Sequence, residues 1–243
     1  MGKVIDKSTP YEKNENLNNK IMLIQSNISE LNVDIIVNFT NNYFLIGNGV
    51  DRSIYSKAGD QLMEYFEDHY NEIETGKFVP TPGFNLKSTE LLLAVPSNDN
   101  DEIIMKNLFL RCLEYMRLTN KKSIVFPCIA PNNVKILNQG LCDILFRNIR
   151  CWLELNQDWN GLIIFCCDNN YDILELYKEK LSYYFPISIN EIVDRKSYLR
   201  LFTQQNKFTE MMKQIEMETN KYIIELMKQN LENNENFPII NDN

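Results

Sequence analysis

Three polar side chains with the chemistry of a hydrolytic or ligand-binding site gather in residues 33–51, VDIIVNFTNNYFLIGNGVD. Asn38 and Asn41 offer both hydrogen-bond donors and acceptors without adding charge. Asp51 stands ten residues after Asn41 and supplies a carboxylate that can accept a proton from water. The loop Gly47-Asn48-Gly49-Val50 lies between them, and such a loop can bring backbone N–H groups close to an anion.

The elements that must position these residues are a strand and a helix. The nearly continuous apolar run from Val33 to Val37 predicts a buried strand, and a helix pattern opens at Val50. Free N–H groups and the helix dipole converge at such a junction, so it favours anionic ligands. Two structural alternatives remain open: Asp51 stabilises the helix start by about 0.3–1 kcal/mol, and Asn41 is an ordinary turn residue.

Strands alternate with helices along most of the chain, which predicts an α/β layered sheet. The stretch 74–86 contains two prolines and is predicted as a loop. The predicted strands are residues 21–25, 33–38, 91–95, 123–126 and 162–166, and the predicted helices are 50–70, 101–116, 141–152 and 171–184.

The domain organisation predicted from these patterns is one α/β domain with additions at both ends. Residues 1–19 are expected to be a disordered or loosely attached polar tail, and 20–185 the domain. Residues 186–235 are expected to be a helical extension, followed by a disordered tail at 236–243. The extension either packs on the domain or serves as a partner-binding or dimerising helix.

Composition narrows the class of protein. The chain has 243 residues, 44% of them apolar, and a formal net charge of −8, which argues against nonspecific binding of nucleic acid or membrane surfaces. The six cysteines include no C-x-x-C pair, and the chain has one histidine. Reduced buried thiols are therefore favoured over a zinc site. The first twenty residues have no apolar segment, so a cytoplasmic or nuclear protein is expected.

The order and spacing of these motifs resemble the macrodomain family, whose members bind or process ADP-ribose. The family's IVNAAN, Gly-rich stretch, GVD-x-x-I and AG correspond here to IVNFTN, LIGNG, VDRSI and KAG within residues 36–59. The family's TGEA and TPGYNL correspond to TGKFVPTPGFNL at 75–86, and FPCI at 126–129 matches the strand before a second phosphate loop. The resemblance covers about residues 20–185 and implies a three-layer α/β/α macrodomain with a mixed central sheet.

The resemblance also implies roles for individual residues. Asn41 falls on the asparagine that contacts the distal ribose in hydrolytic members, and Asp51 on the aspartate that orients or activates water there. Asn27 falls on the acidic residue that usually reads the adenine amino group, and Phe165 is a candidate for lining the adenine side. The remaining implied ligand-binding residues are Ile28, Asn38, Gly47, Asn48, Gly49, Val50, Ala130, Asn132, Asn133 and Val134.

Three departures from the family pattern concern ligand binding. Asn27 replaces an acid, which removes a charge-assisted hydrogen bond. Ile46 and Asn48 replace glycines in the first loop. The second loop, residues 130–135, lacks both family glycines and the aromatic residue, and Pro131 has no N–H to donate.

The function implied by the resemblance is binding of ADP-ribose or ADP-ribosylated proteins. An active member would be an ADP-ribosylhydrolase that cleaves mono-ADP-ribose from protein or the ester of O-acetyl-ADP-ribose. The alternatives are a reader without catalysis and a degenerate domain that acts as an interaction module, with a protein partner or self-association through the C-terminal helix. No cofactor and no metal is implied, and neither membrane nor nucleic acid is expected as a partner.

Overall fold

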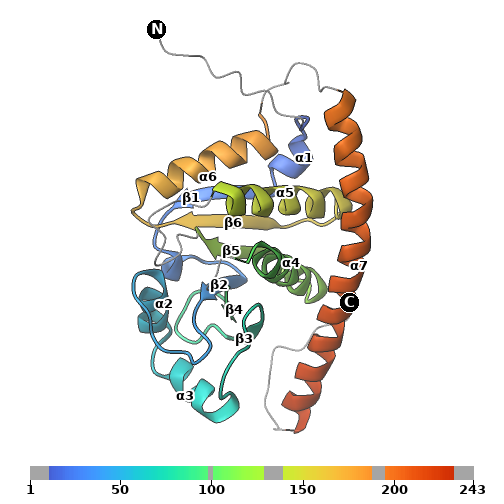
Figure 1. Ribbon diagram of the computed structural model, residues 1–243. Coiled ribbons are helices and arrows are strands. Elements are labelled where there is room, and N and C mark those ends of the chain that lie inside the picture. Colours follow the sequence, from blue (N-terminus) through green and yellow to red (C-terminus); the bar gives the residue numbers. More distant parts are fainter. Residues whose placement is uncertain (1–10, 98–100, 129–138, 188–194, 233–243) are drawn as a thin grey trace.

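A six-stranded sheet forms the centre of the computed structural model, which describes residues 11–97, 101–128, 139–187 and 195–232 (Figure 1). The strand order is β1-β6-β5-β2-β4-β3, and all neighbours are parallel except the antiparallel pair β3 and β4. The mixed sheet predicted from the sequence is therefore confirmed. The strands are β1 (Ile21–Gln25), β2 (Ile35–Phe39), β3 (Phe78–Pro82), β4 (Glu90–Ala94), β5 (Ser123–Pro127) and β6 (Leu162–Cys167).

Helices cover both faces of this sheet and give a three-layer α/β/α domain (Figure 1). One apolar cluster joins α4, α5 and α6 to one face, and a second joins α2, α3 and the short 3-10 helix η1 to the other. The helices are α1 (Glu15–Asn18), η1 (Ile28–Glu30), α2 (Val50–Ala58), α3 (Gln61–His69), α4 (Glu102–Leu118), α5 (Gln139–Leu155), α6 (Tyr171–Tyr184) and α7 (Arg195–Glu232).

The strands read as continuous apolar runs because both of their faces are buried. Ile35 and Val37 of β2 belong to the cluster under α4 and α5, whereas Ile36 belongs to the cluster under α2 and α3. In β5, Phe126 belongs to the cluster under α4 and α5, and Val125 belongs to the cluster under α2 and α3. This is the alternation of a pleated strand with both sides covered.

Two predicted boundaries in the middle of the chain are wrong. The helix expected over residues 50–70 is divided into α2 and α3 at Gly59, whose φ of 88° does not continue a helix. A Cβ at this position would lie 2.6 Å from Asn85 Nδ2, so the bend also requires a residue without a side chain. The stretch 74–86, predicted as a loop because of its prolines, contains the edge strand β3. Prolines are compatible with an edge strand because one side of it has no ladder partner.

The expected polar tail also differs from the structure where the structure describes it. Tyr11 is 7% exposed and Leu17, in α1, is fully buried, and both join the cluster under α4 to α6. The Arg150 guanidinium lies 5.5 Å from the Tyr11 ring centroid. Two apolar residues within a polar stretch thus anchor residues 11–18 to the domain, although the average composition of the stretch indicated disorder.

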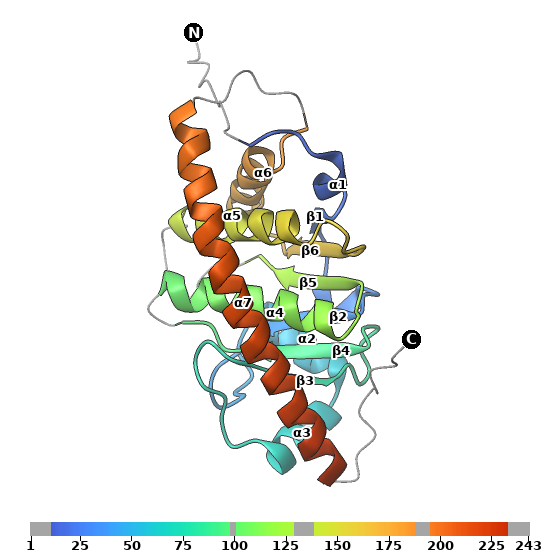
Figure 2. The same cartoon turned by 90° about the vertical axis from the view of Figure 1, so that its right-hand side faces the viewer.

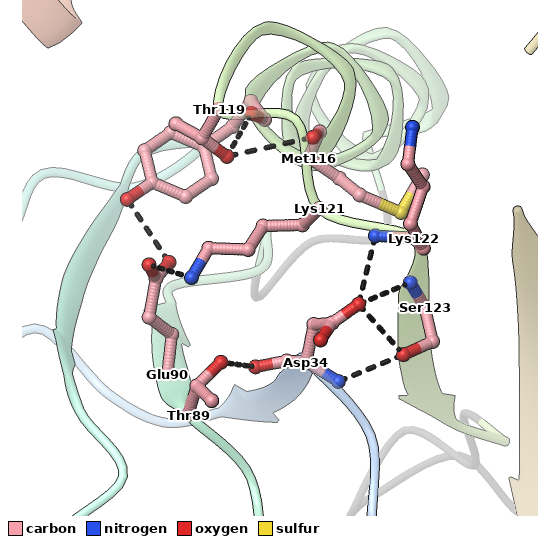
Figure 3. A network of polar contacts seen from close by, with 9 residues as sticks. Asp34, Thr89, Glu90, Met116, Thr119, Lys121, Lys122 and Ser123 are labelled. Atoms are coloured by element: carbon pink, nitrogen blue, oxygen red, sulfur yellow. Dashed lines mark hydrogen bonds and ion pairs between the residues drawn. The ribbon is translucent and has the colours of Figure 1, made fainter. Parts of the chain in front are cut away.

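Asp34 ties the amino ends of β2 and β5 together (Figure 3). Its Oδ2 accepts hydrogen bonds from Lys122 N at 2.7 Å, Ser123 N at 2.9 Å and Ser123 Oγ at 3.0 Å. Thr89 Oγ1, just before β4, donates to Asp34 O at 2.8 Å. These bonds hold the amino ends of three neighbouring strands, β5, β2 and β4, together. Connecting loops follow the carboxyl ends of these strands.

Glu90 is a second acidic anchor at this end of the sheet (Figure 3). Its side chain is buried, and it accepts a hydrogen bond from Tyr115 OH at 3.1 Å and pairs with Lys121 Nζ at 2.8 Å. A buried carboxylate needs such partners because its desolvation is costly. The pair holds α4 against β4.

The helix α7 confirms the predicted helical extension and crosses the outside of α4 as one 38-residue helix (Figure 2). Its buried side chains join the cluster beneath it: Phe208, Met212, Ile215 and Ile223. Arg111 of α4 pairs with Glu218 at 2.6 Å, and Tyr222 OH donates to Phe78 O in β3 at 2.8 Å. The extension therefore packs on the domain from α4 to the edge of the sheet.

All six cysteines are free thiols; four are buried, and Cys128 and Cys151 are half-buried. Among the described helices, none combines the length and the apolar character that crossing a membrane requires.

Candidate functional site

The candidate site lies where β2 ends and α2 begins, at the carboxyl edge of the sheet. Asn38, the fourth residue of β2, is fully buried, and Asp51 lies in the first turn of α2. The ten residues between β2 and α2, 40–49, form the loop that connects them. This confirms the strand–loop–helix junction that the sequence predicts.

Asp51 is held as a hydrogen-bond acceptor by two donors from different elements. Asn38 Nδ2 donates to Asp51 Oδ1 at 2.6 Å, and Gly47 N donates to Asp51 Oδ2 at 2.5 Å. The Asp51 residue is 9% exposed. Burial raises the pKa of this carboxyl above its ordinary value, and the two hydrogen bonds oppose that rise because they favour the ionised form.

Gly47 and Gly49 are each required in the loop, for different structural reasons. A Cβ on Gly47 would lie 2.9 Å from Asp51 Oδ2, so the bond between the Gly47 N–H and the carboxylate needs the bare backbone. Gly49 has a φ of 58°, which residues with a side chain rarely adopt. It is the N-cap of α2 and makes no side-chain capping bond. The first N–H groups of a helix lack intrahelical partners, so this end of α2 can receive an anion.

Two hydroxyl residues beside Asp51 were not found from the sequence. Thr40 follows β2, and Tyr55 lies one helical turn after Asp51; they are 9% and 4% exposed. Burial raises the pKa of Tyr55 to about 12, so its phenol stays protonated, while the nearby Thr40 hydroxyl opposes that shift. The i, i+4 spacing from Asp51 to Tyr55 is the signal that could have found it.

Asn41 lies in the same loop but bonds to its own turn. Its Oδ1 accepts hydrogen bonds from Tyr43 N and Leu45 N, each at 3.1 Å, and its Nδ2 donates to Leu45 O at 2.5 Å. These bonds match the turn-residue alternative for Asn41. One Nδ2 hydrogen is left for a ligand, whereas both acceptor positions of Oδ1 are occupied.

Asn27, the predicted base-reading residue, caps η1 at the carboxyl end of β1. Its Oδ1 accepts hydrogen bonds from Ser29 N at 3.1 Å, Ser29 Oγ at 2.9 Å and Ser53 Oγ at 3.1 Å. Ser53 belongs to α2, so this cap connects η1 to the helix that carries Asp51. Ile28 is 3% exposed, and its side chain packs in the cluster under α2 and α3.

The structure places the remaining predicted residues as follows. Asn48 is exposed in the loop, and Val50, half-buried, starts α2. Phe165, the candidate for lining the adenine side, is fully buried in the core beside Phe126 and Phe146. Four predicted residues of the second loop lie outside the described residues: Ala130, Asn132, Asn133 and Val134.

The sequence and fold match known proteins. The family model of the Macro domain matches residues 37–135. ADP-ribose glycohydrolase MACROD1 of Rattus norvegicus is 31% identical over 184 residues, which is 73% of this chain and 70% of the rat protein. The alignments to the mouse and cattle proteins of that name span 56% of their length. O-acetyl-ADP-ribose deacetylase of Escherichia fergusonii is 30% identical over 122 residues, 47% of this chain and 69% of that protein.

Solved structures share the fold. The macro domain of ganglioside induced differentiation associated protein 2 superposes with a TM-score of 0.67 at 24% identity, over 74% of this chain and 92% of that one. A Trypanosoma brucei macrodomain in complex with ADP-ribose superposes with a TM-score of 0.61 at 24% identity, over 72% and 75%.

Proposed function

The chain belongs to the macrodomain family, and from this premise we propose that it binds ADP-ribose at the junction of β2 and α2 and hydrolyses mono-ADP-ribose linked to protein. The observation that carries the proposal is Asp51: a buried carboxylate at a helix start, fixed by Gly47 N and Asn38 Nδ2. The relatives named as glycohydrolase and deacetylase support it.

The chemistry requires a group that acts on water beside the sugar. Cleavage at the distal ribose develops positive charge on the sugar, which a nearby carboxylate stabilises. Asp51 also accepts a proton from the attacking water, and its raised pKa makes it a stronger base than an ordinary aspartate. The N–H groups at the start of α2 hold the diphosphate.

One observation favours binding without hydrolysis as a second candidate function. The Oδ1 of Asn41 is engaged by Tyr43 N and Leu45 N, so the acceptor that would hold a ribose hydroxyl is not free. In that case the protein is a reader that recognises the modification and leaves it in place.

The proposal is tested by incubating the protein with a mono-ADP-ribosylated substrate and measuring the release of ADP-ribose. We expect release by the wild type and a loss of about 100-fold or more in Asp51→Ala. The matched control is Asp60→Ala, because Asp60 is also an aspartate at a helix start but is exposed and makes no capping bond.

Calorimetric titration with ADP-ribose separates the outcomes. Binding without release by the wild type would leave the reader function and remove the hydrolase. An absence of heat at millimolar ADP-ribose, together with no release, would contradict both candidate functions.

A further inference from the structure

Three exposed apolar residues lie within four positions of the loop that precedes Asp51. Tyr43 is 64% exposed, Leu45 67% and Ile46 49%, and we call them the loop patch. Single exposed apolar residues are normal on protein surfaces, but a contiguous group rimmed by polar residues marks an interaction site. Ile46 directly precedes Gly47, whose N–H holds the Asp51 carboxylate. The loop patch therefore directly precedes the candidate site in the chain.

The loop is ordered by specific contacts, and these turn the patch outward. Phe44, between Tyr43 and Leu45, is 4% exposed and stacks on Phe66 with ring centroids 3.9 Å apart. It adopts a φ of 57°, a conformation unusual for a residue with a large side chain. Burial of this ring offsets the backbone cost and leaves its neighbours facing solvent.

The base of the loop is fastened to a second segment. Asn42 Nδ2 donates to Ile73 O at 2.7 Å, and Ile73 N donates to Asn42 O at 2.9 Å. Ile73 is itself 3% exposed. Together with the three bonds of Asn41 these contacts preorganise the loop, and a preorganised surface loses less entropy on binding.

We propose that the loop patch binds the polypeptide that carries the ADP-ribose, through an apolar stretch next to the modified residue. This rests on the proposed function: the bond to be cut joins the sugar to a protein, so that protein lies directly outside the site of Asp51. The stretch 41–50, NNYFLIGNGV, contains no charged residue in a chain of net charge −8. Its surface is thus suited to an uncharged apolar segment.

The test compares two substrates that share ADP-ribose and differ in the attached group. One is a mono-ADP-ribosylated protein, and the other is O-acetyl-ADP-ribose, which carries an acetyl group in place of the protein. The variant is the double substitution Tyr43→Ser and Leu45→Ser, which keeps Phe44, Ile46 next to Gly47, and the backbone bonds. We expect its kcat/KM to fall about tenfold for the protein substrate, mainly through KM, and to stay within about twofold for O-acetyl-ADP-ribose.

The matched control carries Met217→Ser and Ile224→Ser, which are 67% and 52% exposed on α7, a helix that packs on α4, α5 and β3. It should behave like the wild type with both substrates. Equal losses on both substrates in the loop-patch variant, or no loss on either, would overturn the inference. A wild-type dimer that the double substitution converts to a monomer, seen by sedimentation, would also overturn it in favour of self-association.

Failure of the proposed hydrolysis is distinguishable from failure of the inference. If the wild type cleaves neither substrate, the same variants are compared by their affinity for the ADP-ribosylated protein and for free ADP-ribose. The inference then requires that the wild type binds the protein-linked form more tightly and that the double substitution removes this difference. Equal affinities in the wild type, or no binding of either form, would refute it.

Discussion

At the scale of single residues, Asp51 shows how one site balances opposing effects on a carboxylate. Burial disfavours its charge, whereas the donors Gly47 N and Asn38 Nδ2 favour it. Burial is the larger effect, so the pKa stays above the ordinary value. Asp51 consequently ionises at a higher pH than a solvated aspartate.

The balance at Asp51 gives a prediction about pH. Asn38→Ala removes a donor to the ionised form, so we expect the Asp51 titration to move to still higher pH. Carbon-13 NMR of the side-chain carboxyl groups measures this directly, and the acid limb of the pH–rate profile should move in the same direction. Asn148→Ala is the control because Asn148 is also a buried asparagine but bonds to Ile144 O on α5. An unchanged or lower Asp51 titration in Asn38→Ala would contradict the account.

The sequence predicted part of the site and missed the rest for physical reasons. Asp51 and the glycines follow from their position at a helix start, because backbone geometry fixes what a residue there can do. For Asn41 the sequence left both a turn role and a ligand role open, and the cap made by Asn27 was not predicted, because a turn or cap competes locally with the ligand for the same acceptor. The sequence alone could not place the Phe165 side chain, because the residues along β6 alternate between the two faces of the sheet.

At the scale of elements, α7 is an amphipathic helix whose two sides have different roles. Ile215 faces the cluster beneath α7 and is 4% exposed, whereas Ile224 is 52% exposed. Sequence periodicity was enough to predict a helix here and that it could pack on the domain. It could not show which neighbour the helix covers, because that depends on contacts such as Arg111–Glu218 between distant segments.

The two sides of α7 can be compared with the same substitution. Ile215→Ala should lower the free energy of unfolding by about 2–4 kcal/mol, since it removes buried methyl and methylene groups and leaves a cavity. Ile224→Ala should change it by no more than about 0.5 kcal/mol. Urea denaturation followed by circular dichroism measures both. Equal effects of the two substitutions would mean that α7 does not pack as described.

Element boundaries show a second limit of prediction. The division of α2 from α3 depends on Gly59 and the Asn85 side chain, which meet only in the folded chain. The strand β3 was missed because prolines disfavour most strands, and its place at the edge of the sheet is a property of the whole topology. Buried apolar runs such as β2 and β6 were predicted well because burial on both faces leaves a strong local pattern.

At the scale of the whole molecule, the candidate site and α7 lie in different parts of the domain (Figure 1). The site is built by β2, α2 and η1, whereas α7 packs on α4, α5 and the edge strand β3. This separation predicts that stability and ligand binding can be changed independently.

Shortening the chain after Pro186 tests this separation. The apolar surface of α4 then meets solvent, so we expect the melting temperature to fall by roughly 5 °C or more. At a temperature where the shortened chain is still folded, its affinity for ADP-ribose should stay within about threefold of the full chain, since among the described residues α7 packs on α4, α5 and β3. Calorimetry measures both quantities. A parallel loss of affinity at that temperature would show that α7 supports the site.

The bond from Tyr222 to Phe78 O has a consequence for the behaviour of the protein in concentrated solution. An open sheet edge offers unpaired backbone groups on which strands of other chains can assemble, the first step toward amyloid. At this edge Pro80 and Pro82 have no N–H to donate, and α7 occupies the Phe78 carbonyl. The helix therefore blocks the edge of β3 and prevents a strand of a neighbouring molecule from pairing there as a seventh strand.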